Sequence, residues 1–461
     1  MTFPVENSNN HTAQLSITND AVIITYSNDE LNETFPLDSI YRAHASGNNI
    51  LELHICRAVG ELHDGSRETL TDVRAAVNWR CETKLYTTAE AHQVVEALQQ
   101  HTSFHQVQPT TKVYVLINPA AGARQAAEQW RETVRPMLEK AGLHDFDVQE
   151  THPDGGTREQ AAQVGLAILQ DAPRPAVIIC LGGDGVLHDL VNGLSDVATR
   201  GARFRIGVIP SGSGNAFAHS LNLQSVEHAT LRIIKDQAEP FRLMDVTLGT
   251  STTVGELSNV VYDPETRKRI LVVMSWGFHC QIVSRARHLD HKLGNVRFAM
   301  AAKELMSELT DYTGTLVALD ARRYIGGGEN NNNDDVFGPK QTEKWNPGRF
   351  TYFLATKQHS LEKGFKIAPL ASHTSKEMDV VIMREATAEQ LTTASIKAFQ
   401  GGRHVQEKDV EYYKTPELIL QVHEADEVCL DGEIIVVPAN GVVRVKVLTD
   451  EPYLEAFSAT C

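Results

Sequence analysis

Apolar runs that end in turns of small residues recur in the first half of the chain. Residues 112–117, 176–180 and 206–209 are rich in Val, Ile and Leu, which is typical of buried strands. Small and polar residues follow each run, and helix-like apolar spacing begins after the second and third turns. This alternation predicts an α/β lobe with a parallel sheet, whose ligand lies at the carboxyl ends of the strands.

The parts on either side of this lobe show mainly strand patterns. Before it, strands at 21–26 and 50–55 precede a segment at 87–100 whose apolar residues fall at helical spacing. After it, the pattern predicts a helix at 386–400 and strands at 244–248, 270–274, 314–319, 350–355, 418–422, 434–437 and 442–448. We therefore expect three parts, which are a β-rich module at 1–105, the α/β lobe at 110–242 and a strand-rich lobe at 243–461. Runs of Gly, Asn and Asp predict a flexible hairpin insertion at 326–348.

The turns after the three strands carry the candidate chemistry. Gly182, Gly183 and Gly185 surround one carboxylate, Asp184, and backbone N–H groups of such a turn at a helix start point toward a bound phosphate. A tight turn with an aspartate helix cap explains one such loop equally well. The companion loops at 118–123 and 210–215 favour a nucleotide phosphate cradle instead. None of the three matches the P-loop or the dinucleotide pattern, which argues against both of those sites.

The motifs in these loops resemble a known family. NPAAG at 118–122, GGDGVLHDLVNGL at 182–194 and PSGSGNAFAHSL at 210–221 resemble the diacylglycerol-kinase-type catalytic domain of lipid kinases. They are most similar to sphingosine kinases and their ceramide kinase relatives. The likeness continues through SWGF at 275–278, LGNVRF at 293–298, GRH at 402–404 and DGE at 431–433, so that it covers roughly residues 110–450.

This resemblance implies a fold and a reaction. The fold would be an α/β nucleotide-binding lobe followed by a β-sandwich lobe that binds a lipid. The β-rich module at 1–105 is similar to a pleckstrin-homology-like module, with a plain β-rich extension as the alternative. The reaction would be ATP-dependent phosphorylation of a lipid hydroxyl with Mg²⁺ as the metal, and it requires a carboxylate that takes the hydroxyl proton. Asp184 is the predicted base, and a purely Mg²⁺-related role is its alternative.

The same resemblance implies a nucleotide-binding set. Asn118 and Thr151 would contact the nucleotide, Arg297 its phosphates, and Glu433 the nucleotide from the second lobe. A surface arginine and an ordinary loop threonine are the alternatives for Arg297 and Thr151. The full predicted set is Asn118, Pro119, Thr151, Gly182, Gly183, Gly185, Ser211, Gly212, Ser213, Gly214, Asn215, Arg297 and Glu433.

The identity of the acceptor is less sharply predicted. Overall likeness points to a sphingoid long-chain base. Sphingosine kinases carry acidic residues a few positions after Trp-Gly-Phe, one of which pairs with the substrate ammonium, but residues 279–287 here contain arginines and no carboxylate. Arginines would repel a cationic base, which leaves diacylglycerol or ceramide as the alternative. An NAD kinase, which shares a GGDG loop, and a catalytically silent lipid-binding regulator are the remaining hypotheses.

Charge and composition narrow the partners. The 43 Lys and Arg against 59 Asp and Glu give a net charge of −16, which argues against nucleic-acid binding and confines any membrane contact to a local surface. The basic stretch at 267–303 is one candidate for that contact. The six cysteines lack CxxC spacing and predict reduced thiols rather than disulfides or a zinc site. A polar N-terminus and short apolar runs predict a cytoplasmic protein that associates peripherally with an intracellular or plasma membrane. Nothing predicts the oligomeric state.

Overall fold

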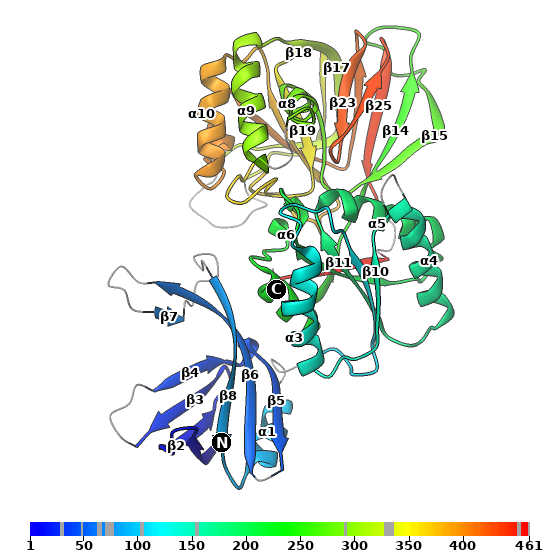
Figure 1. The fold of residues 1–461 in the computed structure, drawn as a ribbon. Coiled ribbons are helices and arrows are strands. Elements are labelled where there is room, and N and C mark those ends of the chain that lie inside the picture. The colour runs from blue at the N-terminus through cyan, green and yellow to red at the C-terminus, as the bar shows by residue number, and fades with distance from the viewer. Residues whose placement is uncertain are drawn as a thin grey trace.

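Three parts follow one another along the molecule in Figure 1. The structure is a computed structural model, and it describes residues 1–27, 32–47, 49–61, 67–69, 78–101, 106–152, 156–289, 293–326, 336–449 and 453–459. A strand-rich module at the N-terminus lies at the bottom of Figure 1, an α/β lobe lies in the middle, and a second strand-rich lobe lies at the top.

The N-terminal module is an antiparallel sheet closed by one helix. Its strands pair in the order β4-β3-β2-β1-β8-β6-β5, and β7 pairs with the last residues of β6, at 59–61. Helix α1 (Ala91–Gln99) buries Val94 and Leu98 against the sheet core, which includes Leu15 and Phe35. The predicted β-rich module with its closing helix is thus confirmed. The strands are β1 (Thr2–Asn7), β2 (Thr12–Ile17), β3 (Ala21–Tyr26), β4 (Glu33–Pro36), β5 (Ile40–Ser46), β6 (Ile50–Glu61), β7 (Arg67–Thr69) and β8 (Asn78–Thr87).

The middle lobe is the predicted α/β unit. The strands β10 (Phe146–Glu150), β9 (Lys112–Ile117), β11 (Ala176–Gly182) and β12 (Phe204–Pro210) form a parallel sheet in that order. Strand β26 (Leu454–Phe457) from the end of the chain adds to β12 in parallel, and β13 (Ala238–Pro240) pairs with β26. The helices are α2 (Ala126–Gln129), α3 (Arg135–Lys140), α4 (Gly156–Gln170), α5 (Asp184–Val197), α6 (Ala216–Ser220) and α7 (Val226–Ile234).

The upper lobe is one curled antiparallel sheet. Its order is β15-β14-β25-β22-β17-β21-β20-β19-β16-β23-β24, with β18 on β17, and Trp276, Phe350 and Phe353 lie in the core inside the curl. The strands are β14 (Met244–Thr250), β15 (Val261–Ile270), β16 (Val273–Gly277), β17 (Tyr312–Arg323), β18 (Gln341–Phe350), β19 (Tyr352–Thr356), β20 (Met378–Met383), β21 (Glu411–Thr415), β22 (Glu417–Val422), β23 (Asp426–Leu430), β24 (Glu433–Val437) and β25 (Gly441–Val447). Helices α8 (Phe278–Ala286), α9 (Val296–Leu305) and α10 (Ala388–Phe399) cover its outer face at the upper left of Figure 1.

Two local predictions for this lobe were wrong. The single strand expected at 270–274 is two strands, because the N–H groups of Leu271 and Val272 leave the sheet and donate to the carboxylate of Asp431. In the insertion expected to be flexible at 326–348, residues 341–348 belong to β18 and pair with β17. Residues 327–335 of that insertion lie outside the described residues.

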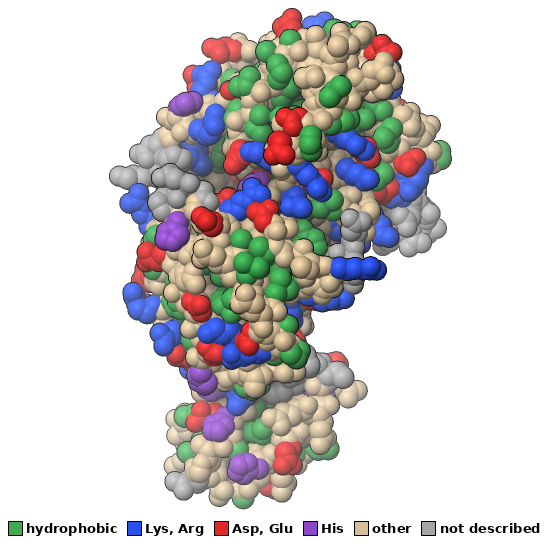
Figure 2. Space-filling view, turned by 90° about the vertical axis from the view of Figure 1, so that its right-hand side faces the viewer, with side chains coloured by type: hydrophobic (Ala, Val, Ile, Leu, Met, Phe, Trp, Pro, Cys, Tyr) green, Lys and Arg blue, Asp and Glu red, His purple; other side chains and the backbone are tan. Residues whose placement is uncertain are grey.

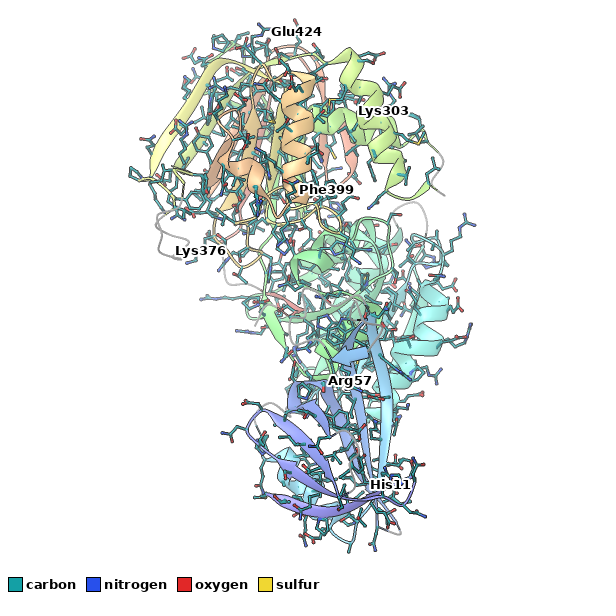
Figure 3. The ribbon with its side chains drawn as sticks, turned by 90° about the vertical axis from the view of Figure 1, so that its left-hand side faces the viewer. His11, Arg57, Lys303, Lys376, Phe399 and Glu424 are labelled. Carbon is teal, nitrogen blue, oxygen red and sulfur yellow. The ribbon has the colours of Figure 1, made fainter. Side chains whose placement is uncertain are left out.

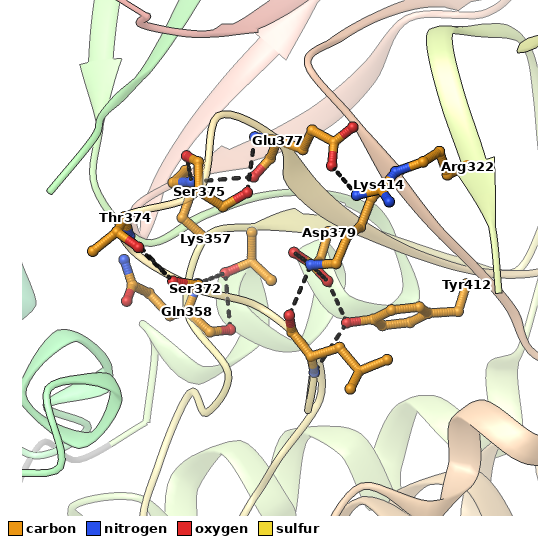
Figure 4. Close-up of polar contacts among 12 residues, drawn as sticks. Arg322, Lys357, Gln358, Ser372, Thr374, Ser375, Glu377, Asp379, Tyr412 and Lys414 are labelled. Carbon is orange, nitrogen blue, oxygen red and sulfur yellow. Dashed lines mark hydrogen bonds and ion pairs between the residues drawn. The ribbon is translucent and has the colours of Figure 1, made fainter. Parts of the chain in front are cut away.

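A buried polar cluster fixes the segment between β19 and β20 (Figure 4). The Asp379 carboxylate is fully buried, accepts from Lys414 Nζ at 2.8 and 2.9 Å, and accepts from the Tyr412 hydroxyl. The ammonium of Lys357 donates to the carbonyl oxygens of Ser375 and Glu377, and burial lowers its pKa to about 7. These contacts hold the two ends of the segment together.

The same segment joins the two lobes that follow the module. The His359 N–H donates to Ser220 Oγ of α6 at 3.1 Å, and the backbone of Arg242 donates to the His373 carbonyl at 3.0 Å. One apolar core also runs from the parallel sheet to Leu271 and Leu391 of the upper lobe. The middle and upper lobes therefore share a common interior.

Candidate functional site

The three small-residue loops meet at the carboxyl ends of the parallel strands. Asn118 N donates to Leu181 O at 2.9 Å, and Ser211 N donates to Gly182 O at 3.2 Å. The backbones of Gly183 and Gly212 are in direct contact, because a Cβ atom on Gly212 would lie 2.4 Å from Gly183 Cα. Loops separated by many residues in sequence thus form one continuous surface of backbone groups.

For the kinase reaction that the sequence predicts, we expect Gly212→Ala to lower kcat/KM for ATP by roughly 10²-fold, because the added methyl group would push apart loops whose relative position sets the reacting geometry. Steady-state kinetics of the purified variant would measure this. Gly47→Ala is the matched control, since a Cβ there has no neighbour within 4 Å. Unchanged kinetics for Gly212→Ala would show that close packing of the two glycine loops is not needed for activity.

Asp184 lies at the centre of this surface. It is the first residue of α5, and its two carboxylate oxygens accept the N–H groups of Ala216 and Phe217, at 2.9 and 3.0 Å, from the start of α6. Burial raises the pKa of Asp184 and the charge of Asp431 adds to that rise, while the two backbone hydrogen bonds oppose it. The net effect is a raised pKa, which makes this carboxylate a better proton acceptor than an exposed aspartate.

A pocket of about 560 Å³ opens beside these loops, between the middle and upper lobes. Figure 2 shows a hollow where these lobes meet, with Lys and Arg side chains along its rim and Asp and Glu side chains beside them. The lining combines the first loop, the start of α5 and the turn before β24. The lining residues are Asn118, Pro119, Ala120, Thr151, His152, Thr157, Gly185, Val186, His188, Asp189, Asp431 and Glu433.

Asp431 connects the pocket to the upper lobe. Its carboxylate accepts the N–H groups of Leu271, Val272 and Val273 at 2.6 to 2.8 Å and lies 3.0 Å from His188 Nδ1. Asp431 itself has a φ of 49°, as the turn between β23 and β24 requires. This single carboxylate therefore fixes the break between β15 and β16 and holds α5 against the upper lobe.

The His188–Asp431 contact predicts a pH-dependent stability. Burial lowers the pKa of His188, but the hydrogen bond and charge of Asp431 outweigh it and raise the pKa above its ordinary value. A raised folded-state pKa gives stability that is complete below the unfolded value of about 6.5 and is lost as the pH rises through the folded value. We expect the difference in unfolding free energy between wild type and His188→Gln to be larger at low pH than at high pH. Urea unfolding of both proteins, below pH 6.5 and again above the folded-state pKa of His188, would measure this difference in unfolding free energy. A difference that is the same at both pH values would contradict the prediction.

Two further carboxylates line the pocket. Glu433 forms an ion pair with Lys268 Nζ at 2.6 Å, so a cation from β15 lies at the edge of the pocket. Burial raises the pKa of Asp189, and nearby Glu433 adds to the rise, against the lowering effects of His188 and Arg158. The pocket wall formed by α5 and β24 is therefore acidic.

The structure places the sequence-predicted residues in three groups. Asn118, Pro119, Thr151, Gly185 and Glu433 line the pocket, although Thr151 and Glu433 are far apart in sequence. The other glycine-loop residues form the adjoining surface, where Ser211 Oγ donates to Gln129 Oε1 at 2.7 Å. The Asn215 side chain accepts the N–H of Gly212 and donates to the Gly212 carbonyl oxygen, which closes the turn between them. Arg297 lies apart from the pocket lining, on α9, with its guanidinium over the Phe298 ring.

Sequence reasoning missed the pairing of His188 with Asp431. The two residues are 243 positions apart, and the only local signal was the Asp-Gly turn at 431–432. It also missed Lys268 as the partner of Glu433, since the basic stretch around it reads as an exposed face. These contacts depend on how the lobes pack.

Two family descriptions match consecutive parts of this architecture. Residues 112–246 match the diacylglycerol kinase catalytic domain, and residues 272–449 match the YegS C-terminal NAD kinase β-sandwich-like domain. The first range holds the three loops and Asp184, and the second holds the curled sheet and Glu433. The chain belongs to the diacylglycerol-kinase-type lipid kinase family.

Similar members of this lipid kinase family come from plants, animals and bacteria. Sphingosine kinase 1 of Arabidopsis thaliana is 23% identical over 70% of this chain and 68% of its own length. Diacylglycerol kinase of Bacillus subtilis is 22% identical over 69% of this chain and 88% of its own length. Sphingosine kinase 2 of Homo sapiens is 26% identical over 46% of this chain, which spans only 31% of that protein.

The fold of the middle and upper lobes is also found in a solved structure. A crystal structure of a Bacillus anthracis protein assigned as a diacylglycerol kinase superposes with a TM-score of 0.54 and 15% identity, over 77% of this chain and 97% of that one. At this identity the likeness concerns the fold of the two lobes.

Proposed function

We propose that this protein is an ATP-dependent lipid kinase that transfers the γ-phosphate of ATP to a lipid hydroxyl, with Asp184 as the base. The observation that carries this proposal is the position of Asp184, where the three loops of small residues meet beside the pocket between the lobes. Phosphoryl transfer needs positioned phosphates, charge neutralisation and a group that accepts the hydroxyl proton. This part of the chain offers backbone groups that can position the phosphates and a carboxylate that can accept the proton.

The pocket suits a nucleotide in size and in chemistry. Its volume of about 560 Å³ falls within the ~300–1,000 Å³ of small-molecule sites. The carboxylates of Asp189 and Glu433 can accept hydrogen bonds from hydroxyls of a ribose, as acidic residues do in other nucleotide sites. The N–H groups of the glycine loops would receive the phosphates at the other end.

Mg²⁺ fits this arrangement as a companion of the nucleotide. In the described ranges no group of three or more His, Cys, Asp or Glu could hold a metal ion by itself. The phosphates would therefore supply most of the ligands, with Asp184 as a candidate carboxylate, in the way that Mg²⁺ is usually bound. When bound, Mg²⁺ would offset the negative charge of the phosphates.

Asp184 supports proton removal through its own contacts. The N–H groups of Ala216 and Phe217 fix both oxygens, so the carboxylate is oriented before any acceptor arrives. Its raised pKa lets it take the proton of a lipid hydroxyl as the oxygen attacks the phosphate, and later release that proton to solvent.

Two classes of acceptor compete. The curated relatives named sphingosine kinases favour a sphingoid long-chain base. Helix α8 favours the alternative, a neutral alcohol such as diacylglycerol or ceramide, because it holds no Asp or Glu that could pair with an ammonium. Burial also lowers the pKa of His279 on this helix to about 4, so its ring is neutral near pH 7.

A panel assay tests this proposal. The purified full chain would be incubated with labelled ATP, Mg²⁺ and a sphingoid base, diacylglycerol, ceramide or NAD, each alone. Label on one or more of the lipids is the expected result. Label on NAD alone would overturn the lipid kinase assignment, and tight vesicle binding without any turnover would favour a silent lipid-binding regulator.

Peripheral membrane contact is the second part of the proposal, and an apolar ridge on α9 and α10 supports it. No helix in the described part of the chain is long and apolar enough to span a bilayer. Figures 1 and 3 show α9 and α10 side by side, and Figure 3 labels Lys303 and Phe399 on this face. Val296 and Met300 on α9 and Ile396 and Phe399 on α10 each expose about half of their surface.

We expect the double variant Met300→Glu/Phe399→Glu to bind phosphatidylcholine vesicles roughly tenfold more weakly or worse, because two apolar side chains would no longer enter the interface. Vesicle sedimentation would measure this. The double variant Val254→Glu/Val261→Glu is the matched control, since it alters exposed apolar residues near β15 instead. Equal vesicle binding by both variants would rule out the ridge as the contact.

A further inference from the structure

Two thiols face each other in the N-terminal module. Cys56 on β6 and Cys81 on β8 are directly opposite residues of an antiparallel pair. The Cα atoms of such residues lie about 4.5 or 5.5 Å apart, and a disulfide needs about 4.4–6.8 Å. Both cysteines are free, and their side chains hydrogen-bond to each other. The backbone thus already has the spacing that a cross-link needs.

The pair lies at the junction of the module with the α/β lobe. Cys81 Sγ contacts Met137 Sδ of α3 at 3.5 Å. Trp79, two residues earlier on the same face of β8, stacks on His228 of α7 with ring centroids 3.9 Å apart, and its indole N–H donates to Gln224 at 3.1 Å. Cys56 is part of the apolar core that continues into the parallel sheet.

The two thiols differ in accessibility. Cys56 is fully buried, whereas Cys81 is partly exposed. The hydrogen bond with Cys81 and burial raise the pKa of Cys56 well above its ordinary value, so Cys56 is the poorer nucleophile at rest. An oxidant from solvent would therefore meet Cys81 first.

We propose that Cys56 and Cys81 are a reversible redox pair, which a hydroperoxide oxidises to a disulfide that ties β6 to β8 at this junction. In the first step the sulfur of Cys81 attacks the peroxide bond, the O–O bond breaks, and Cys81 sulfenic acid and water form. In the second step the sulfur of Cys56 displaces the sulfenic hydroxyl as water and the S–S bond forms. Two thiols lose two electrons and two protons, and one hydrogen peroxide is reduced to two waters.

The remaining described cysteines lack this cross-strand arrangement; Cys280 and Cys429 lie near each other, but both are fully buried, so an oxidant from solvent reaches them less readily than Cys81. Cys180, Cys280 and Cys429 are buried, and the residue opposite Cys429 on β16 is Ser275. A disulfide that forms under mild oxidation should therefore be specific to the β6–β8 pair. A thiol reductant would reverse it, as is typical of redox-sensing rather than structural disulfides.

The test uses the reduced full-length protein. It would be exposed to hydrogen peroxide, alkylated, digested without reduction and mapped by mass spectrometry. We expect one dominant linked peptide that joins Cys56 to Cys81, that disappears after dithiothreitol, and that is absent from Cys81→Ser but retained in Cys180→Ser. Separate alkylation of both thiols in oxidised wild type, or a predominant link to any other cysteine, would overturn the proposal. Because the wild type carries the decisive result, a poorly folded variant would not obscure it.

Discussion

Asp184→Asn should lower kcat for lipid phosphorylation by about 10²–10⁴-fold, which is the usual contribution of a general base. The amide has nearly the same shape, but it cannot take the proton of the acceptor hydroxyl, and it can accept only one of the two N–H groups of Ala216 and Phe217. The affinity for ATP should change little, because the backbone groups of the glycine loops and the pocket lining are retained. Steady-state kinetics together with nucleotide-binding titration would separate these two effects.

Asp196→Asn is the matched control for that substitution. Asp196 lies on the same helix, α5, but it is exposed and pairs with Arg158 on the surface. It should leave kcat within about twofold, since exposed ion pairs contribute little. Activity of Asp184→Asn near the wild-type rate would remove Asp184 from the role of base and favour its Mg²⁺-related alternative.

Lys414→Met should destabilise the upper lobe by about 3–5 kcal/mol, because it leaves the carboxylate of Asp379 buried without its cation. Asp379 and Lys414 are both buried, and among the described side chains the Tyr412 hydroxyl would remain as the hydrogen-bond donor to that carboxylate, with Lys357 nearby. The free energy of unfolding in urea would measure the loss.

Two further variants make this stability prediction specific. Lys408→Met removes an exposed lysine nearby in sequence and should change the unfolding free energy by less than about 0.5 kcal/mol. The double variant Lys414→Met/Asp379→Leu should recover much of the lost stability, because it removes both buried charges. A double variant as unstable as Lys414→Met would show that packing, and not the unpaired charge, dominates the effect.

The elements that could be predicted from the sequence are those with long local signals. The strands at 112–117, 176–180 and 206–209 each keep an apolar run of the kind typical of a buried strand, and the structure has β9, β11 and β12 there. Helix α10 was predicted from its spacing, and Thr387 with Gln390 forms the capping box that starts it.

The elements that could not be predicted depend on distant residues. Strand β26 has four residues and joins the parallel sheet only through β12 and β13, so its own sequence does not show which lobe it enters. The break after Ile270 exists because Asp431, 160 residues away, binds the N–H group of Leu271. Short elements and single carboxylates acquire their roles from packing between lobes.

The candidate site also has a part that local sequence predicts and a part that depends on contacts between distant residues. The glycine loops and Asp184 were predictable because their backbone chemistry is local, and all of them lie at one end of the parallel sheet. Of the three carboxylates in the pocket wall, only Glu433 was predicted as a site residue. Asp189 and Asp431 line the pocket because α5 packs against the upper lobe, which the sequence does not show. The predicted phosphate contact of Arg297 stays a prediction.

The central claim is that the Asp184 junction passes the γ-phosphate of ATP to a lipid hydroxyl. The most direct measurement follows labelled γ-phosphate from Mg·ATP in the presence of a detergent-dispersed lipid alcohol, and counts ADP and lipid phosphate in the same samples. We predict one lipid phosphate for each ADP formed by the wild type, with both products falling together in Asp184→Asn. Formation of ADP without any labelled lipid would contradict the account.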